Sequence, residues 1–365
     1  MVFAEIVGTL SFLQPQADDD FVDRLHYYYT STFLLVTAVL ISLKMFGGRP
    51  IECWVPAEYK GGWEEYTEMF CWARNTYWVS FEEDLPEDFN IRKQRMVSYY
   101  QWTPFFLVIC AFFFYSPCLI WRLMYAKSGI RLKDIMQFAT DKSNIQPASR
   151  RANVQGLSAH LSSIFKYRFR FGTHNRSYHS CLKLLNMRHF EAYLTLLYIL
   201  IKILYMINLF GQLQMFLMNR FLQTDDYSCY GFEVIKDLIN GRQYHQVFIL
   251  LWMWYSLLAL ISSISCFSWL IFAMSFEQRK KFIARRLELA DIEFEQKNFS
   301  CELDKFVRKH VKLDGVFVLK MLSAHAGMLI CTEVVDNMWD NFLVEEGICI
   351  PCSSDYDNTR VDTDF

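Results

Sequence analysis

The feature that most constrains this chain is a run from Met96 to Trp121 that contains no Asp, Glu, Lys or Arg. A helix needs about 20 mostly apolar residues to cross the hydrocarbon core of a bilayer, so this run is long enough to span a membrane. It opens with tyrosine and tryptophan, whose rings favour the membrane surface. Pro104 removes a backbone donor a turn into the run and should bend the helix unless it falls in the first turn.

Composition extends this prediction to the whole chain, because 53% of the 365 residues are hydrophobic and 17% are aromatic. The apolar residues are concentrated in blocks, which is typical of a multi-span membrane protein rather than of soluble domains. We expect four spans at residues 27–46, 96–121, 191–218 and 247–276. The predicted fold class is an all-α membrane protein, a four-transmembrane-helix bundle with a cytoplasmic helical domain.

The loops between the spans carry opposite charge. Residues 47–95 contain ten acidic and six basic side chains, whereas residues 122–190 contain thirteen basic side chains and two acidic ones. Positive loops stay in the cytosol, so we expect residues 47–95 outside and both termini inside. The cluster Arg92-Lys93-Arg95 favours the opposite orientation, but the longer basic loop and Arg279-Lys280-Lys281 after the last span outweigh it.

The remaining segments complete a plasma-membrane topology. They are a cytoplasmic-side N-terminal segment 1–26, a second outside loop 219–246, a cytoplasmic helical domain 277–344 and a disordered tail 345–365. The first segment contains Glu5 and Asp18-Asp19-Asp20 and lacks a basic start, so we do not expect a cleaved signal peptide. From the sequence alone, this segment could equally fold into a pore mouth or lie on the membrane as an interfacial helix.

Polar residues mark one side of the third span, and that side is expected to face protein or water. At about 100° per residue, its members are Tyr198, Tyr205, Asn208, Gln212 and Asn219. Hydrogen bonding to neighbouring helices is favoured over pore lining. Lys202 is a candidate site residue because a charge is costly in hydrocarbon, although near the inner end it could reach the surface.

The fourth span has two further features. Trp252, Trp254 and Tyr255 resemble an aromatic belt at the outer membrane surface, and Ala259, Ser262, Ser263 and Cys266 have the spacing of small residues that lets helices pack closely. In the cytoplasmic domain, Asp314-Gly315 is expected to break one helix from the next.

Cysteines provide the strongest chemical feature. Cys53 and Cys71 lie in the acidic, tryptophan-rich loop, and their spacing favours a structural disulfide role over free or metal-bound thiols. Cys349 and Cys352 lack a second pair or nearby histidines, and His310 and His325 are assigned to packing or surface. No nucleotide-binding, metal-binding or nucleophile motif occurs in a usable context, so no catalytic site, cofactor, metal or nucleic-acid partner is expected.

Several sequence motifs resemble one family. Span two opens with Tyr99-Tyr100-Gln101-Trp102-x-Pro104, which resembles the signature of the innexins, the invertebrate gap-junction subunits. Similar stretches in the same order are Asp20-Phe-Val-Asp-Arg24, Pro50-Ile-Glu-Cys53-Trp-Val-Pro56, Leu251-Trp-Met-Trp-Tyr255 and Ala324-His-Ala-Gly327. The resemblance covers most of the chain.

The resemblance implies a non-enzymatic pore subunit that forms a gap-junction channel or hemichannel. Eight copies would form a ring in the membrane, with innexin-like subunits as homo- or hetero-oligomeric partners, and ions and small molecules would pass through it. The N-terminal segment and the first span would line the passage. The candidate pore-lining residues are Met1, Val2, Phe3, Glu5, Thr30 and Thr37.

One departure from the family affects the outside loops. The family's second outside loop carries two cysteines that bridge to the first loop, but here Arg242-Gln-Tyr-His-Gln246 runs almost directly into the fourth span. Cys53 and Cys71 could therefore pair with each other, one could reach Cys229, or both could stay reduced. Docking to an apposed cell is in doubt. The alternatives are a docking-deficient isoform that modulates full-length relatives and, with less support, a four-span transporter or receptor.

Overall fold

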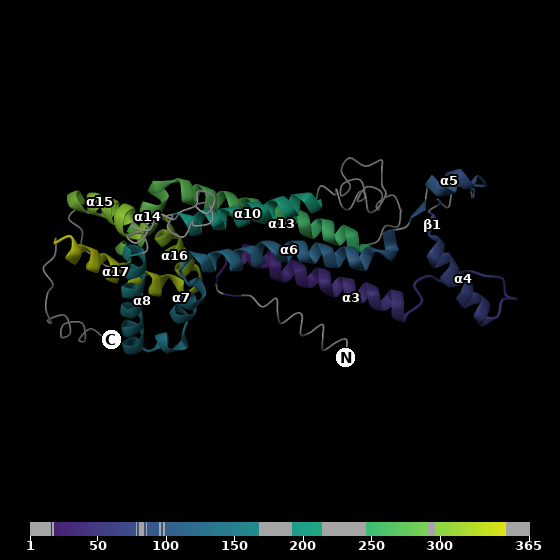
Figure 1. Ribbon diagram of the computed structural model, residues 1–365, viewed down its shortest axis with the longest axis horizontal. Coiled ribbons are helices and arrows are strands. Elements are labelled where there is room, and N and C mark those ends of the chain that lie inside the picture. Colours follow the sequence, from purple (N-terminus) through teal and green to yellow (C-terminus); the bar gives the residue numbers. More distant parts are fainter. Residues whose placement is uncertain are drawn as a thin grey trace, which may run out of the picture. The chain divides into compact units, whose positions relative to one another are not determined.

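The computed structural model describes residues 16, 18–77, 79, 84, 86–94, 96–97, 99–167, 192–213, 246–290 and 296–347. The chain divides into two compact units. Unit 1 comprises residues 1–15, 21–120 and 201–266, and unit 2 comprises residues 16–20, 121–200 and 267–365. Figure 1 shows that the described parts of both units are mainly helical.

Four helical stretches are long and apolar enough to cross a membrane, which confirms the predicted all-α, four-span fold. The first runs from Phe21 to Gly47 through α2 (Phe21–Arg24), the π-helix η1 (Leu25–Thr30) and α3 (Ser31–Gly47). The other three are α6 (Thr103–Tyr125), α10 (Tyr193–Leu213) and α13 (Gln246–Met274). Each overlaps one of the predicted spans.

The core of unit 1 forms where α3 meets α6, α10 and α13, which lie side by side in Figure 1. Large side chains from α6 and α13 fill it, and small ones such as Ala38 and Ala111 allow the helices to approach closely. The Ser31 hydroxyl donates to the Ala111 carbonyl at 3.1 Å, which joins the first and second spans directly. The buried members are Leu34, Ala38, Phe106, Leu107, Cys110, Ala111, Phe114, Leu209, Leu251, Tyr255, Leu258 and Ala259.

Two prolines in α6 show how the second span keeps its helix. Pro104 is the second residue of the helix, where its missing N–H is not needed, so the expected bend does not arise there. Pro117 lies in the interior and leaves the Phe113 carbonyl without its usual amide donor. The Ser116 hydroxyl donates to that carbonyl at 3.1 Å, so the backbone group keeps a partner inside the membrane.

Loop 1, the connection between the first two spans (residues 47–95), is partly folded. It contains α4 (Gly61–Arg74) and α5 (Phe89–Gln94), and a two-residue antiparallel pair joins β1 (Thr76–Tyr77) to β2 (Met96–Val97). The 3-10 helix η2 (Tyr99–Gln101) then leads into α6. Asn75 follows α4 with a positive φ of 70° and a ψ of 161°, a backbone conformation that residues other than glycine rarely adopt.

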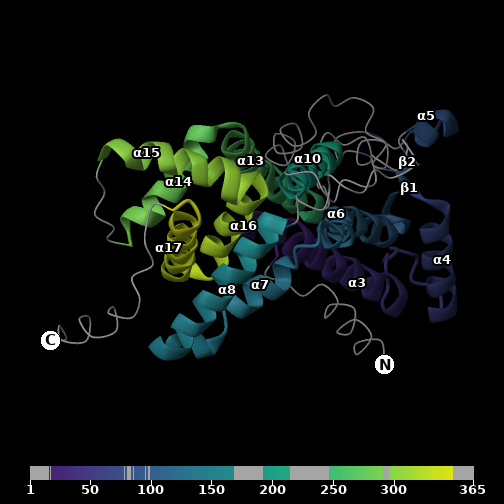
Figure 2. The same cartoon turned by 60° about the vertical axis from the view of Figure 1, so that its left-hand side comes forward.

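Figure 2 shows the helices of unit 2 from a second direction. The longest, α8 (Pro147–Tyr167), contacts α17 (Gly327–Glu345), α7 (Leu132–Ala139) and the π-helix η7 (Phe306–Val311). The other elements are η3 (Ala126–Ser128), η4 (Lys142–Ile145), α14 (Phe276–Glu288), α15 (Gln296–Lys305) and α16 (Lys312–His325).

An aromatic cluster organises the centre of unit 2. Tyr198 lies 5.3 Å from Trp121, 4.9 Å from Trp269 and 5.1 Å from Phe317, measured between ring centroids. The Lys320 ammonium lies 3.8 Å from the centroid of the Trp269 ring, within the range of a cation–π interaction. The cluster thus joins residues of α6, α10, α13 and α16 within this unit.

The expected break at Asp314-Gly315 is wrong, because both residues lie inside α16 and are buried. A Cβ atom at Gly315 would lie 2.8 Å from Val311 Cγ1 and 3.1 Å from Phe165 Cε2. The glycine therefore allows close packing rather than a turn. The chain breaks instead at Gly327, which has a positive φ of 87° and begins α17.

Replacing Gly315 with Ala should lower the free energy of unfolding of this region by about 1–3 kcal/mol, because a buried methyl group has no space there. Thermal unfolding of the purified protein in detergent measures the effect. Gly156→Ala is the matched control, since an added Cβ in the middle of α8 meets nothing within 4 Å. That change should stabilise the helix by about 0.5–1 kcal/mol. Equal effects of the two substitutions would contradict the packing argument.

Candidate functional site

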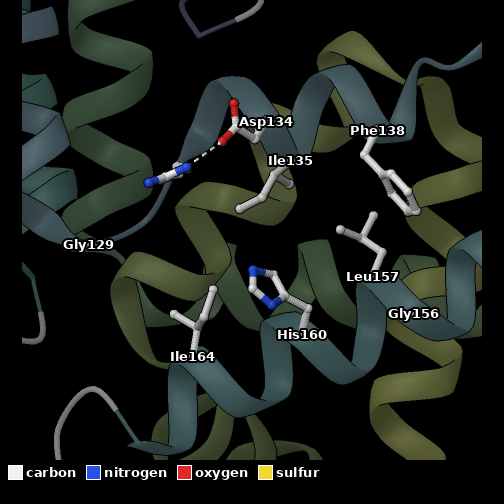
Figure 3. Close-up of a pocket in the computed structure, with 9 residues that line it drawn as sticks. Gly129, Asp134, Ile135, Phe138, Gly156, Leu157, His160 and Ile164 are labelled. Carbon is white, nitrogen blue, oxygen red and sulfur yellow. Dashed lines mark ion pairs between the residues drawn. The ribbon is translucent and has the colours of Figure 1, made fainter.

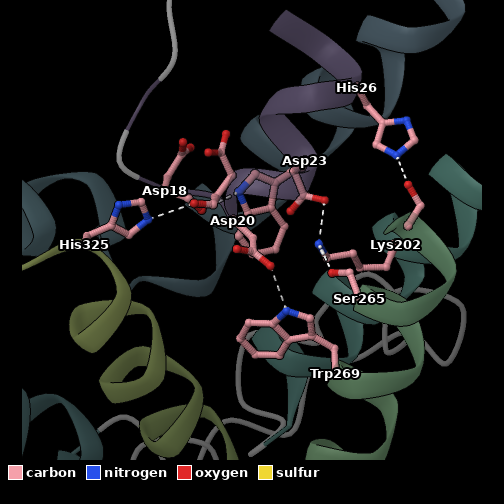
Figure 4. A network of polar contacts seen from close by, with 11 residues as sticks. Asp18, Asp20, Asp23, His26, Lys202, Ser265, Trp269 and His325 are labelled. Carbon is pink, nitrogen blue, oxygen red and sulfur yellow. Dashed lines mark hydrogen bonds and ion pairs between the residues drawn. The ribbon is translucent and has the colours of Figure 1, made fainter. Parts of the chain in front are cut away.

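A buried ion pair ties the start of the first span to the third and fourth spans. Lys202 Nζ lies 2.9 Å from Asp23 Oδ1, and each side chain is 4% exposed. The same ammonium donates to Ser265 Oγ at 3.1 Å (Figure 4). A lysine and an aspartate at this depth are tolerable only because each neutralises the other and further hydrogen bonds satisfy them.

Lys202 therefore does not extend toward the membrane surface, contrary to one expectation from the sequence. Its acidic partner precedes the first apolar block, so a search for charges within the predicted spans missed it. The helix of the first span begins at Phe21, earlier than the expected residue 27, and thereby includes Asp23. Hydropathy could not show this, because Asp23 and Arg24 look like a loop end.

A second polar contact lies on the π-helix that follows. His26 Nε2 and Ser262 Oγ are 2.6 Å apart, and the imidazole stacks on Tyr205 with 4.6 Å between ring centroids. The Thr30 hydroxyl donates to the Leu25 carbonyl at 2.7 Å and accepts from Trp254 Nε1 at 2.9 Å. π-Helical turns in α-helices are frequent at functional sites, and this one turns polar side chains toward the fourth span.

The pore-lining candidates receive different positions. Thr30 is fully buried between the first and fourth spans, so its side chain meets protein rather than a water path in this arrangement. The Thr37 side chain is only partly buried in α3, and its hydroxyl donates to the Phe33 carbonyl at 2.8 Å. Met1, Val2, Phe3 and Glu5 lie outside the described residues.

Unit 2 holds residues 18–20, the segment that immediately precedes the first span (Figure 4). Trp121 Nε1 donates to the Asp18 carbonyl at 3.2 Å, and Trp269 Nε1 donates to Asp20 Oδ2 at 3.2 Å. His325 Nε2 lies 2.8 Å from the Asp19 carbonyl, which makes it a third donor. Donors on α6, α13 and α16 thus hold three consecutive residues. His325, which the sequence assigned to packing or the surface, has a specific hydrogen-bond partner.

Asp314 is a further buried carboxylate of unit 2, and it caps α10 from a distant part of the sequence. Its oxygens accept from the backbone N–H of Leu194 at 3.1 Å, the N–H of Thr195 at 3.0 Å and the Thr195 hydroxyl at 3.0 Å. Amides in the first turn of a helix lack partners within the helix, and negative charge is favourable there. This carboxylate therefore determines how the third span begins.

The signature at the start of the second span clamps the end of α4. Tyr100 Oη and Gln101 Nε2 both donate to the Trp72 carbonyl, at 2.9 and 2.7 Å, and the Tyr100 and Trp72 rings lie 4.4 Å apart. Trp72 is in the last turn of α4, where carbonyls lack helical partners. Trp102 is largely exposed, Pro104 starts α6, and the side chain of Tyr99 lies outside the description.

Cys53 and Cys71 are brought together beside this clamp. The Cys71 thiol and the Glu68 side chain, one turn before it, are both close enough to Cys53 to affect its ionisation. Loss of water first, and the Cys71 and Glu68 side chains second, raise the pKa of the Cys53 thiol above its ordinary value. Cys229, the third disulfide candidate, lies outside the described residues.

Unit 2 also contains a pocket of about 670 Å³ between α7 and α8 (Figure 3). Its walls are mainly apolar, with Ile135, Phe138 and Leu157 among them. Arg131 and Asp134 form an exposed ion pair at 3.5 Å on its edge. Small-molecule sites usually have buried polar groups that converge on the ligand. The polar side chains here are exposed, so the pocket is not a strong ligand site.

Within the described ranges, no group of three or more His, Cys, Asp or Glu side chains could hold a metal ion. The buried polar residues of the two units instead pair with other protein groups, as Asp23 does with Lys202 and Asp314 with the start of α10. Their arrangement supports a structural role: they determine where membrane helices begin. A fold of this kind belongs to the class of four-span membrane proteins with a helical domain after the last span.

Comparison with known proteins identifies the family. The innexin family profile matches residues 19–247 and 244–342, which together cover most of the chain. The chain belongs to the innexin family, whose members are gap-junction channel proteins rather than enzymes. The two matched segments meet at residues 244–247, where the second outside loop was expected to be shortened.

The most similar relatives include three innexins of Caenorhabditis elegans. The chain is 34% identical to Innexin-10 over 382 positions, which cover 94% of the chain and 68% of that protein. It is 34% identical to Innexin-11, with 94% and 83% covered, and 33% identical to Innexin unc-9, with 93% and 95% covered. The 382-position alignment is longer than the 365-residue chain, so Innexin-10 has residues with no counterpart here.

Replacing Lys202 with Met should destabilise the protein by about 3–5 kcal/mol, because the Asp23 carboxylate would stay buried without its cation. The measurements are the melting temperature and the yield of folded protein in detergent. The double variant Asp23→Asn, Lys202→Met should recover much of the loss, since no charge remains buried. Lys44→Met is the control, because Lys44 is exposed near the end of α3. A double variant as unstable as the sum of the single changes would show that the two residues are not coupled.

Replacing Asp314 with Ala should loosen the first turn of the third span, because two amides and one hydroxyl lose a charged acceptor. Hydrogen bonds to charged groups contribute about 1.5–3 kcal/mol each. Hydrogen exchange followed by mass spectrometry should show faster exchange at Leu194 and Thr195. Asp314→Asn should be intermediate, as it keeps one acceptor oxygen. Asp134→Ala, which removes an exposed carboxylate, serves as control. Unchanged exchange in folded Asp314→Ala would rule out the capping role.

Proposed function

We propose that the chain is a pore-forming subunit of an innexin-type channel. The observation that carries this proposal is the innexin match over residues 19–342 of a chain with four spans. The channel would conduct ions and small solutes passively, with selectivity set by pore width and lining charge. The subunit would span the plasma membrane at cell junctions with both termini in the cytosol, as the loop charges favour.

The burial of the spans supports assembly into a ring. Within a single copy, 28% of the most apolar window of the first span and of the fourth span is buried, against 50% for the second. The first and fourth spans therefore leave most of their surface for lipid or other copies. Following the family resemblance, we propose rings of eight subunits, in homo- or hetero-oligomers. The N-terminal segment and the side of α3 that contains Thr37 would lie along the passage.

Reconstitution of the purified protein tests the function directly. We expect a ring-shaped assembly in electron micrographs, and conductance and dye uptake in lipid vesicles. A preparation that stays monomeric in lipid and conducts nothing would contradict the proposal. Images would also show whether two rings meet face to face.

A substitution in the first span tests the passage itself. Thr37→Cys should react with a water-soluble thiol reagent, because the Thr37 side chain is only partly buried within one copy. The modification should reduce the current if this side chain lies along the passage. Thr30→Cys is the matched control and should not react, because Thr30 is fully buried. The unmodified chain corrects for its native cysteines. A conducting Thr37→Cys channel that the reagent leaves unchanged would place this side of α3 away from the passage.

The second candidate function is modulation of other innexins. The two matched segments meet at residues 244–247, at the end of the expected second outside loop, which favours a shortened loop. A subunit with such a loop would join full-length relatives and reduce their end-to-end docking. Co-expression distinguishes the two functions, since a modulator changes the junctional current of a relative and gives no current alone. The transporter or receptor alternative gains no support, as Lys202 is already paired with Asp23.

A further inference from the structure

Loop 1 brings two thiols together in a way that neither the family match nor the four-span fold assigns. Cys53 lies in the irregular segment before α4, and Cys71 lies in the last turn of that helix. The two thiols are close enough for Cys71 to affect the ionisation of Cys53, although seventeen residues separate them in sequence.

A separate contact shows that these two parts of loop 1 run alongside each other. Arg49 Nη1 lies 3.9 Å from Glu68 Oε1, four residues before Cys53 and three before Cys71. The Glu68 side chain is largely buried despite its position in a surface loop. The Arg49–Glu68 and Cys53–Cys71 contacts therefore place the segment 49–53 against the last turns of α4.

From this geometry, we propose that Cys53 and Cys71 form a disulfide with each other, which closes loop 1 without cysteines from the second loop. A disulfide needs two chain segments that lie close alongside each other, and the Arg49–Glu68 contact brings these two segments together. The proposal depends on the outside position of loop 1, which belongs to the proposed function. Pairing within one loop differs from the bridges between loops that the resemblance implies.

The oxidation requires a partner from the secretory pathway, where disulfides form. A thiol oxidoreductase in its disulfide form would accept the electrons. One cysteine, as thiolate, attacks that disulfide to give a mixed disulfide, and the other then displaces the enzyme sulfur. Two thiols become one S–S bond, and their two protons and two electrons pass to the enzyme, which is left as a dithiol. Both cysteines are partly exposed, so such an enzyme can reach them.

The bond would stabilise the region that the Tyr100 and Gln101 clamp also holds. Cys71 precedes Trp72, whose carbonyl accepts both hydrogen bonds from the start of the second span. The disulfide would tie the chain that leaves the first span to this same point. Loop 1 would then keep its fold whatever the length of the second outside loop.

Peptide mapping of the full-length protein tests the pairing. The protein is purified from the plasma membrane of eukaryotic cells lysed in N-ethylmaleimide and digested with trypsin without reduction. Trypsin cleaves after Lys60 but not at Arg49, which precedes Pro50, so peptides 45–60 and 61–74 each contain one of the two cysteines. We expect these peptides to be cross-linked, with a mass two hydrogens below their sum. Both peptides carrying maleimide, or either one linked to peptide 221–236 with Cys229, would overturn the proposal.

Single substitutions give a second measurement. Cys53→Ser and Cys71→Ser should each raise labelling of the remaining loop 1 cysteine by a membrane-impermeant maleimide on intact cells, from near zero to one label at that residue, measured by peptide and apart from any label on Cys229. Cys229→Ser is the control and should leave Cys53 and Cys71 unlabelled. If Cys229→Ser exposed either thiol, the pairing within loop 1 would be wrong. Loss of conductance with the cross-link present would count against the proposed function alone, whereas conductance with both thiols free would overturn only the disulfide.

Discussion

A charge inside the hydrocarbon layer is stable only when the protein supplies its counter-charge, and the buried pair of Asp23 and Lys202 meets this condition. The pair determines where the first span begins, because Asp23 must lie at the depth of Lys202. It also positions the π-helix that follows, where His26 reaches Ser262 and Thr30 receives the indole of Trp254. The packing of the first span against the third and fourth depends on these polar contacts as well as on the apolar core.

Unit 2 also uses buried carboxylates and carbonyls to hold helix ends and neighbouring segments in place. Asp314 supplies the acceptors that the first turn of α10 lacks, and indole and imidazole donors hold residues 18–20. Each contact joins parts of the chain that lie far apart in sequence. The helices after the last span therefore do more than pack against one another, since Asp314 and His325 of α16 hold the start of α10 and the Asp19 carbonyl.

The four spans could be predicted because the cost of exposing polar groups to lipid leaves long apolar blocks in the sequence. The polar side of the third span was predicted to face protein or water, with protein favoured, and Tyr198, Tyr205 and Gln212 are buried. The partner of Lys202 could not be found, because one-dimensional hydropathy does not show which distant residues meet. Tyr255 was expected at the membrane surface, yet it lies in the core, since a belt residue and a core aromatic look alike in sequence. Gly315 resembled a helix break, and only the positions of Val311 and Phe165 explain it.

The π-helix η1 gives the first span one extra residue near its start. A π turn holds one residue more than an α turn, and the Thr30 hydroxyl marks it by bonding to the carbonyl five residues earlier. If that residue moved into the α-helix on either side, the side chains beyond it would rotate by about 100° while the rest of the helix stayed intact. The first span can therefore turn one end against the other by a register shift, with no hinge or break in the chain.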